Sequence, residues 1–220
     1  MKSIKISLIT ALFIATTAFA EEKSDIGISA NVAMTSNYVW RGMTQSDNSS
    51  AIQGGFDLDY KGIYAGVWGS NIKFDESDAN MEFDAYVGYE DEIYGFGYDV
   101  GYIQYAYPND SKALNLGEAY LGLSYNFHSF ELNAKYSLGV QTDDTEADDC
   151  IEGGVSISLP MDISFDATLG NYIHTGIYYE TAISKSFDKF ELSLAYTGMN
   201  YDESSSDNES NVIATISASF

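Results

Sequence analysis

The chain of 220 residues has little positive charge, cysteine or proline. It carries 10 lysines and arginines against 33 aspartates and glutamates, with one cysteine and two prolines. Nucleic-acid binders use Lys and Arg to displace counterions from phosphate, so a net charge of −23 excludes a nucleic-acid partner bound by charge. One cysteine excludes an internal disulfide and a cysteine-based zinc site.

Long apolar runs are also missing after the first twenty residues. A helical membrane span needs about 18 or more apolar residues, and none follows residue 20. Residues 1–20 begin with Lys2 and Lys5, continue with an apolar stretch and end in Ala18-Phe19-Ala20. This is the pattern of a secretory signal peptide. We expect cleavage after residue 20, leaving residues 21–220 as one domain outside the cytoplasm.

Alternation of apolar and polar residues dominates the rest of the chain. In residues 190–198, Phe190, Leu192, Leu194 and Tyr196 share one face, and polar or small residues share the other. A period of two residues indicates β-strands. No segment shows a helical stripe. The pattern therefore predicts an all-β protein.

Twelve such segments follow one another, most of them about 9–14 residues long. A tilted strand needs about 9–11 residues to cross a bilayer, and bacterial outer-membrane barrels have an even number of strands. We therefore predict an antiparallel up-and-down transmembrane β-barrel of about 12 strands. The predicted strands are 26–40, 52–60, 63–74, 81–90, 93–106, 117–127, 130–141, 150–159, 161–172, 177–187, 190–200 and 211–220.

The connections between these segments alternate in length. The odd connections have about four to eleven residues and the even ones one or two. Outer-membrane barrels have short periplasmic turns and longer outer loops, so both termini are expected on the periplasmic side of a Gram-negative outer membrane. The last segment alternates up to Phe220, and we interpret this ending as a signal for the outer-membrane assembly machinery.

The polar face of the predicted strands carries many carboxylates and few bases. In a membrane barrel the apolar face contacts lipid and the polar face lines the interior. Glu90 belongs to this polar face too. The candidate pore-lining residues are Arg41, Asp57, Asp59, Lys73, Glu82, Asp84, Asp99, Glu118, Glu131, Lys135, Glu152, Asp162, Asp166, Glu180 and Glu191.

Two stretches near the start and one near the end carry a resemblance to a known family. Residues 31–45 (NVAMTSNYVWRGMTQ), 51–72 and 183–198 resemble the TorF-family porins, a family also described as bacterial proteins of unknown function. The chain departs from that pattern at Asn37 and Trp40, where Asp and Phe are expected. The resemblance implies an outer-membrane barrel with a porin role, and it supplies no catalytic residue and no known substrate.

Residues suited to catalysis are few and scattered. His128 falls in a predicted periplasmic turn and His174 in a predicted outer loop, so they are expected at opposite ends. A Ser-His-Asp set requires its members within hydrogen-bond reach. Cys150 follows Asp148 and Asp149, whose charges disfavour a reactive thiolate. We expect neither an enzyme nor a cofactor, although a phospholipase-like membrane enzyme would share the strand count.

The predicted outer loops are acidic, above all residues 143–149 (DDTEADD). Ca²⁺ is bound by six to eight oxygen ligands, but the EF-hand spacing is missing. A solvated acidic loop explains this composition, and so does a divalent cation that bridges the loops to lipopolysaccharide. The weak candidates for metal ligands are Asp143, Asp144, Glu146, Asp148 and Asp149.

These observations favour a narrow passive channel for small hydrophilic solutes, with a preference for cations. Rings of like charge in a pore attract counterions and repel co-ions. The alternative is a non-conducting structural or surface-interaction barrel whose acidic loops are the working part. The two differ in whether the lumen is open, and loop 107–116 or loop 142–149 is a candidate for folding into it.

Overall fold

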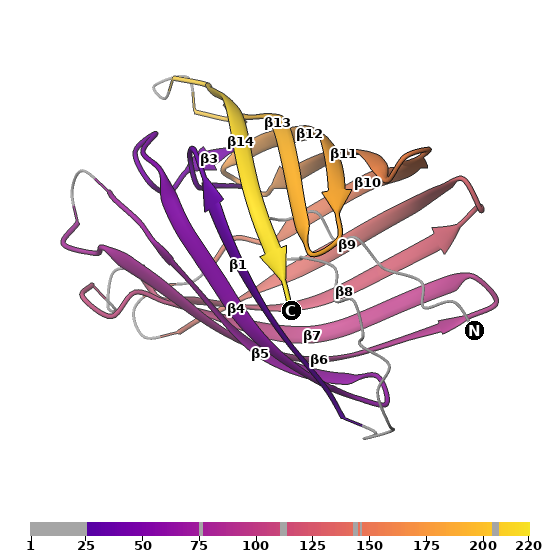
Figure 1. Ribbon diagram of the computed structural model, residues 1–220. Coiled ribbons are helices and arrows are strands. Elements are labelled where there is room, and N and C mark those ends of the chain that lie inside the picture. The colour runs from indigo at the N-terminus through magenta and orange to yellow at the C-terminus, as the bar shows by residue number, and fades with distance from the viewer. Residues whose placement is uncertain (1–25, 75–76, 111–113, 143–144, 146, 204–206) are drawn as a thin grey trace.

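The computed structural model describes residues 26–74, 77–110, 114–142, 145, 147–203 and 207–220. Within these residues, twelve antiparallel strands pair with their neighbours in sequence order and close into a barrel (Figure 1). The predicted fold class is therefore confirmed. No helix in the described part of the chain is long and apolar enough to cross a membrane. The predicted signal peptide, residues 1–20, lies outside the described residues.

The barrel strands follow the predicted segments within a few residues at each end. They are β1 (Gly27–Thr35), β4 (Ala51–Tyr60), β5 (Ile63–Asn71), β6 (Met81–Ile93), β7 (Phe96–Ala106), β8 (Leu116–Asn126), β9 (Phe130–Val140), β10 (Cys150–Leu159), β11 (Ile163–Tyr172), β12 (Gly176–Phe187), β13 (Phe190–Tyr201) and β14 (Glu209–Ser219).

The barrel closes where the first strand meets the last. β1 pairs with β14 through a register that places Asn31 opposite Ser219. Phe220 continues this ladder, because its amide donates to the carbonyl of Ala30 at 2.9 Å and its carbonyl accepts from the Ala30 amide at 3.1 Å. The first and last strands are thus joined at the seam, and a barrel in lipid needs such closure.

The two ends of the barrel differ in the length of their connections. One end carries tight turns, such as Lys61-Gly62 between β4 and β5, and we call it the short-turn end. Lys61 and Gly62 both have positive φ, of 51° and 87°, the backbone of a type I′ hairpin turn, in which glycine is favoured. The other end, the long-loop end, carries the longer connections, including residues 36–50 and 107–115. The start of β1 and the end of β14 lie together at the short-turn end (Figure 1).

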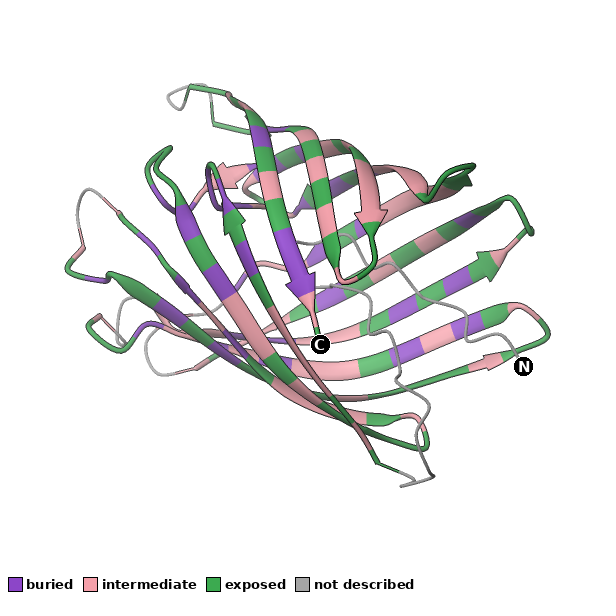
Figure 2. Cartoon of the chain, viewed as in Figure 1, coloured by how far each residue is buried: buried purple, intermediate pink, exposed green. Residues whose placement is uncertain are grey.

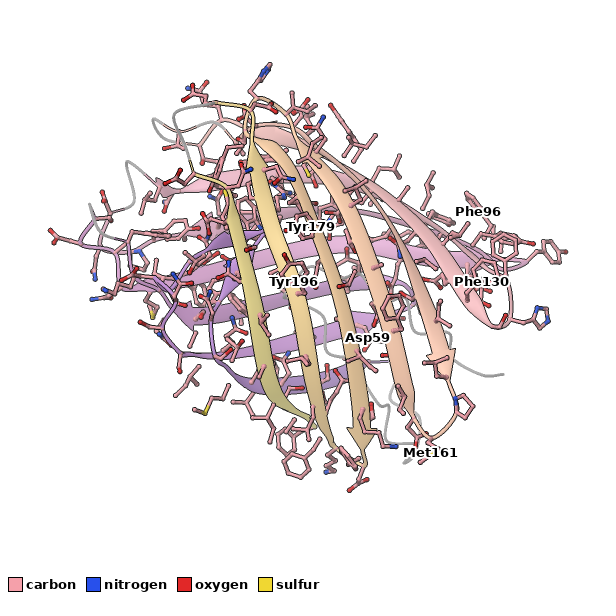
Figure 3. All side chains as sticks on the ribbon, turned by 90° about the horizontal axis from the view of Figure 1, so that it is seen from above. Asp59, Phe96, Phe130, Met161, Tyr179 and Tyr196 are labelled. Atoms are coloured by element: carbon pink, nitrogen blue, oxygen red, sulfur yellow. The ribbon has the colours of Figure 1, made fainter. Side chains whose placement is uncertain are left out.

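The outer surface of the barrel is apolar. Along most strands exposed and buried residues alternate (Figure 2), and the exposed set is rich in Ile, Leu, Val and Phe. Phe96 and Phe130 point outward near the short-turn end (Figure 3), where Tyr125 and Phe127 add a ring pair with centroids 4.6 Å apart. An apolar band with aromatic rings at its edge matches a bilayer and its interface.

The first predicted segment is wrong at its end. The sequence suggested one strand over 26–40, but β1 ends at Thr35, and residues 39–44 form a separate hairpin of β2 (Val39–Trp40) and β3 (Met43–Thr44). This hairpin belongs to the connection between β1 and β4, which we call loop 1 (residues 36–50). Apolar residues alternate through Tyr38 and Trp40 as well, but here they pack inside the barrel instead of facing lipid.

Candidate functional site

The inner wall of the barrel collects most of the charged residues that the sequence analysis selected. They alternate with exposed apolar residues on the same strands, and so point into the lumen. Those on the inner face are Asp57 and Asp59 (β4), Glu82 and Asp84 (β6), Asp99 (β7), Glu118 (β8), Glu131 and Lys135 (β9), Glu152 (β10), Asp166 (β11), Glu180 (β12) and Glu191 (β13).

Two of the selected residues do not lie on the inner wall. Asp162 lies in the turn before β11, with positive φ and an exposed side chain, and its carboxylate is 3.7 Å from the Lys185 ammonium. Lys73 lies beyond the end of β5 and forms an ion pair with Asp47 of loop 1. Both strands are shorter than predicted, so alternation counted through these residues gave the wrong side.

Loop 1 brings another of the selected bases, Arg41, into the lumen. Arg41 and Gly42 form the two-residue turn of the β2–β3 hairpin, with φ of 48° and 80°, so the turn is again of the type that favours glycine at its second position. The Arg41 guanidinium donates to both carboxylate oxygens of Glu118, at 2.6 and 2.8 Å. Arg41 is 4% exposed and Glu118 2%, so the ion pair is closed off from water.

Aromatic rings surround this ion pair. The Arg41 guanidinium carbon lies 4.4 Å from the ring centroid of Trp40 and 4.7 Å from that of Tyr172. Trp40 in turn meets Tyr105 of β7 and Tyr172 of β11, with centroids 5.7 and 5.6 Å apart. Burial lowers the pKa of Arg41, but the Glu118 carboxylate outweighs it and the pKa is raised. The guanidinium is therefore held charged by its partner.

Loop 1 also reaches the opposite side of the barrel. The Thr44 amide donates to the carboxylate of Glu209 in β14 at 2.9 Å. The hairpin thus makes contacts with β7, β8, β11 and β14, strands that lie around most of the circumference. The hairpin crosses the lumen at the long-loop end and narrows it there.

Asn37 holds loop 1 in this position. Its amide nitrogen donates to Asn48 at 3.2 Å and to Asn211 of β14 at 3.3 Å. Its carbonyl oxygen accepts from the Thr44 hydroxyl at 2.8 Å and from the Ser46 hydroxyl at 2.9 Å. Both halves of the amide are therefore used, which a carboxylate at this position would not allow.

Several other carboxylates on the inner wall are held by tyrosine hydroxyls. Tyr64 donates to Asp99 at 2.6 Å. Tyr86 donates to Asp57 and Tyr178 to Glu152. A hydroxyl donor orients a carboxylate without neutralising it, so these contacts keep negative charge on the wall.

Lys135 provides the second base inside the barrel. Its ammonium lies 3.1 Å from Glu152 Oε1. A hollow that is open to solvent adjoins this pair and is also lined by Asp99, Ser124 and Asn133. Among the described residues, Arg41 and Lys135 are the bases on the inner side, each bound to one carboxylate. The remaining inner carboxylates leave the lumen strongly acidic.

The candidate metal ligands in the acidic loop are only partly described. Asp143, Asp144 and Glu146 lie outside the described residues. Asp148 accepts from the Thr175 hydroxyl at 3.2 Å, and Asp149 accepts from Tyr136 and from the Gly139 amide. In the described ranges, no group of three or more His, Cys, Asp or Glu side chains is arranged to hold a metal ion.

The residues considered for catalysis lie apart. His128 is in the turn between β8 and β9 at the short-turn end, and His174 follows β11 at the long-loop end. Cys150 is buried on the inner face of β10 with its sulfur 3.5 Å from the Tyr178 hydroxyl.

Sequence reasoning missed the role of loop 1. Asn37, Tyr38 and Trp40 were noticed only through the family pattern or their position near a strand end. The pair Arg41-Gly42 was the available signal, because a residue followed by glycine between two short apolar stretches is typical of a tight hairpin. Which side of the wall that hairpin occupies depends on contacts with β8 and β14, which are distant in sequence.

Solved structures that share this fold include outer-membrane proteins. A structure described as "KdgM porin in complex with disordered oligogalacturonate" aligns with 88% of this chain and 98% of its own, at 10% identity and a TM-score of 0.60. The NanC porin aligns with 88% of this chain and 99% of its own, at 13% identity and a TM-score of 0.54. Outer membrane phospholipase A from Escherichia coli aligns with 86% and 89%, at 9% identity and a TM-score of 0.54. At such identities the likeness concerns the fold, which is that of a porin-like bacterial outer-membrane β-barrel.

Sequence comparison gives one family. No curated protein matches the chain. The model of the Gcw_chp family, described as bacterial proteins of unknown function, matches residues 19–220. Because this match covers the whole barrel, the chain belongs to the Gcw_chp family.

Proposed function

We propose that the protein is a narrow outer-membrane porin of the TorF type that passes small hydrophilic solutes passively and prefers cations. The observation that carries this proposal is the charge of the inner wall. Many carboxylates face the lumen from strands all around the barrel, whereas Arg41 and Lys135 are the bases on the inner side of the described chain. A lumen of one sign of charge concentrates counterions and repels co-ions.

The size of the barrel supports a narrow passage. Eight strands leave an interior filled by side chains, and sixteen leave a wide aqueous channel, so twelve strands lie between these cases. Loop 1 reduces the opening further at the long-loop end. The short-turn half is wider, because its inner residues, such as Asp59 and Ser29, remain partly or fully exposed. The constriction at loop 1 is therefore expected to set the conductance.

Localisation and assembly follow from the same proposal. Residues 1–20 direct export as a cleaved signal peptide, and both termini and the short turns face the periplasm. The apolar belt contacts outer-membrane lipid, and the acidic outer loops lie next to lipopolysaccharide. Phe220, which completes the ladder between β14 and β1, is the residue presented to the assembly machinery. We propose no catalytic role and no cofactor.

The second candidate function is a non-conducting barrel that acts through its surface. The observation in its favour is the loop 1 hairpin, whose Trp40 touches β7 and β11. If side chains close the lumen completely at this level, the protein acts through its acidic outer loops. The two candidates differ in whether solutes pass.

A swelling assay with proteoliposomes separates them. The refolded mature barrel is exposed to solutes of similar size that are cationic, neutral or anionic, such as glucosamine, glucose and gluconate. The porin proposal expects the order cation, neutral, anion, with differences that shrink at high ionic strength because salt screens the wall. No swelling with any of the three, in a sample whose heat-modifiable gel migration proves folding, would favour the non-conducting barrel. Equal swelling rates with all three solutes would show that the barrel has no charge preference.

A further inference from the structure

Two carboxylates lie buried side by side on the inner face of β6 at the long-loop end. Glu82 and Asp84 are two positions apart and so point the same way, and they are 2% and 0% exposed. Neither oxygen of Asp84 has a hydrogen-bond partner, and Oε2 of Glu82 has none either. A buried carboxylate without a partner is strongly unfavourable, so such a group in a protein is protonated, paired with a base or bound to a metal.

Arg41 and Lys135, the bases inside the described barrel, form ion pairs with other carboxylates. Arg41 is bound to both oxygens of Glu118, and Lys135 is bound to Glu152. The Tyr105 ring interacts both with the Arg41–Glu118 pair and with Glu82 and Asp84. Two neighbouring carboxyl groups are thus left without a base on one side of this ring.

The two carboxylates lie among aromatic rings and a few polar side chains, and Asp84 is opposite Trp68 and Tyr105 in the strand register. Strand register places Gln53 opposite Ser70, and Ser70 opposite Glu82, so the three form one row on the inner wall. The Tyr38 side chain is 1% exposed, and its hydroxyl also has no hydrogen-bond partner. From the lumen side, Tyr38 of loop 1 faces both carboxylates, and burial together with these two charges raises the pKa of its hydroxyl well above the ordinary value.

We propose that Glu82 and Asp84 bind a divalent cation, Ca²⁺, between the barrel wall and loop 1. The available donors are carboxylate and phenol oxygens, which suit hard cations. Two negative charges match a divalent ion, and Ca²⁺ accepts an irregular set of six to eight oxygens that includes water. The ion would fix Tyr38, and through it loop 1, against β6. This site is distinct from the acidic outer loops and does not depend on whether the barrel conducts.

Thermal unfolding of the refolded full barrel in detergent tests the proposal. After treatment with a chelator, Ca²⁺ is added at constant ionic strength and the melting temperature is followed by circular dichroism. Ligand that binds only the folded state raises this temperature, by about 5–10 °C at a hundredfold excess over Kd for a domain of this size. The double variant E82Q/D84N should lose the shift. The matched control D166N, which changes a partly exposed carboxylate elsewhere on the inner wall, should keep it.

Terbium luminescence gives a second reading that does not depend on stability. Tb³⁺ replaces Ca²⁺ at oxygen sites and emits when nearby aromatic rings are excited, and Tyr38 and Trp68 lie in contact here, with centroids 5.4 Å apart. Emission displaced by Ca²⁺ is expected from the wild type and from the loop variant D148N/D149N, and not from E82Q/D84N.

Three outcomes would overturn the proposal. They are no Ca²⁺-dependent shift in the wild type, an equal shift in E82Q/D84N, or terbium emission that disappears in the loop variant instead. If E82Q/D84N fails to show heat-modifiable migration, equilibrium dialysis of the loop variant D148N/D149N decides. One Ca²⁺ per barrel in the loop variant supports the site, and no saturable binding contradicts it.

Discussion

Arg41 and Glu118 form a two-point ion pair across the lumen, with nitrogen–oxygen distances of 2.6 and 2.8 Å, although 77 residues separate them in sequence. Both side chains are buried. The pair joins the turn of the loop 1 hairpin to β8, so it fixes the hairpin inside the barrel. Arg is suited to this role because its planar group matches both carboxylate oxygens at once.

Removing one partner of this pair should destabilise the barrel strongly. Arg41→Met or Glu118→Gln leaves the other charge in a dry environment, which costs about 3–5 kcal/mol in comparable buried pairs. The double variant R41M/E118Q should lie much closer to the wild type, since no charge is left unpaired. Urea titration of folding into lipid vesicles gives the free energy of unfolding for all four proteins. A double variant whose loss equals the sum of the two single losses would show that the two residues do not depend on each other.

Shortening loop 1 should widen the passage without opening the barrel. Replacing residues 38–46 by a short Gly-Ser linker removes Tyr38, Trp40 and Arg41 from the lumen but leaves every barrel strand in place. The single-channel conductance should rise several-fold. Because Glu118 then loses its partner, the variant is also made with Glu118→Gln. An unchanged conductance in a folded variant would mean that the constriction lies elsewhere.

Neutralising wall carboxylates in the short-turn half and the middle of the barrel should weaken the cation preference. Asp57, Asp166 and Glu180 lie on three different strands and have no bound base. The triple variant D57N/D166N/E180Q should show a reversal potential closer to zero in a KCl gradient. The matched control is D162N, because Asp162 is exposed in a turn beside Lys185, and it should behave as the wild type. An equal change in the control would assign the effect to overall charge.

The outer loop residue Asp149 should make stability fall in acid. The Tyr136 hydroxyl and the Gly139 amide donate to its carboxylate and lower its pKa below the ordinary 3.8. A lowered folded pKa means that this contribution is present above about pH 3.8 and is lost as the pH falls through the lower folded value. In Tyr136→Phe, carboxyl NMR titration should show the pKa of Asp149 moving up toward 3.8. A value that does not move would show that the hydroxyl is not responsible.

The sequence predicted the barrel well because lipid imposes its pattern on every strand. Residues such as Leu192 and Leu194 must face hydrocarbon while Ser193 faces the lumen, so period-two alternation is uninterrupted over each crossing. Connection lengths distinguished the two ends, since tight turns such as Lys61-Gly62 join the strands at one of them. These are local properties, so they can be recognised in short stretches of the sequence.

The interior was predictable only in part, because it depends on contacts between distant residues. The alternation of polar and apolar residues placed Asp57 and Glu180 on the inner wall. It could not show that Asn37 would bind Asn211 or that Arg41 would reach Glu118. Counting the alternation also gave the wrong position for Asp162 and Lys73, which lie just outside their strands. An apolar stretch such as Tyr38 to Trp40 satisfies the pattern equally well against lipid and inside a packed lumen.

The reversal potential of the wild-type barrel in a planar bilayer tests the central claim most directly. The refolded protein is inserted between KCl solutions of unequal concentration, at low salt, where the charge of the wall is least screened. The account predicts steady, small single-channel conductance with a reversal potential of the sign that marks K⁺ as the more permeant ion, declining as both salt concentrations are raised. Equal permeability to K⁺ and Cl⁻ at low salt, or a folded barrel without conductance, would contradict it.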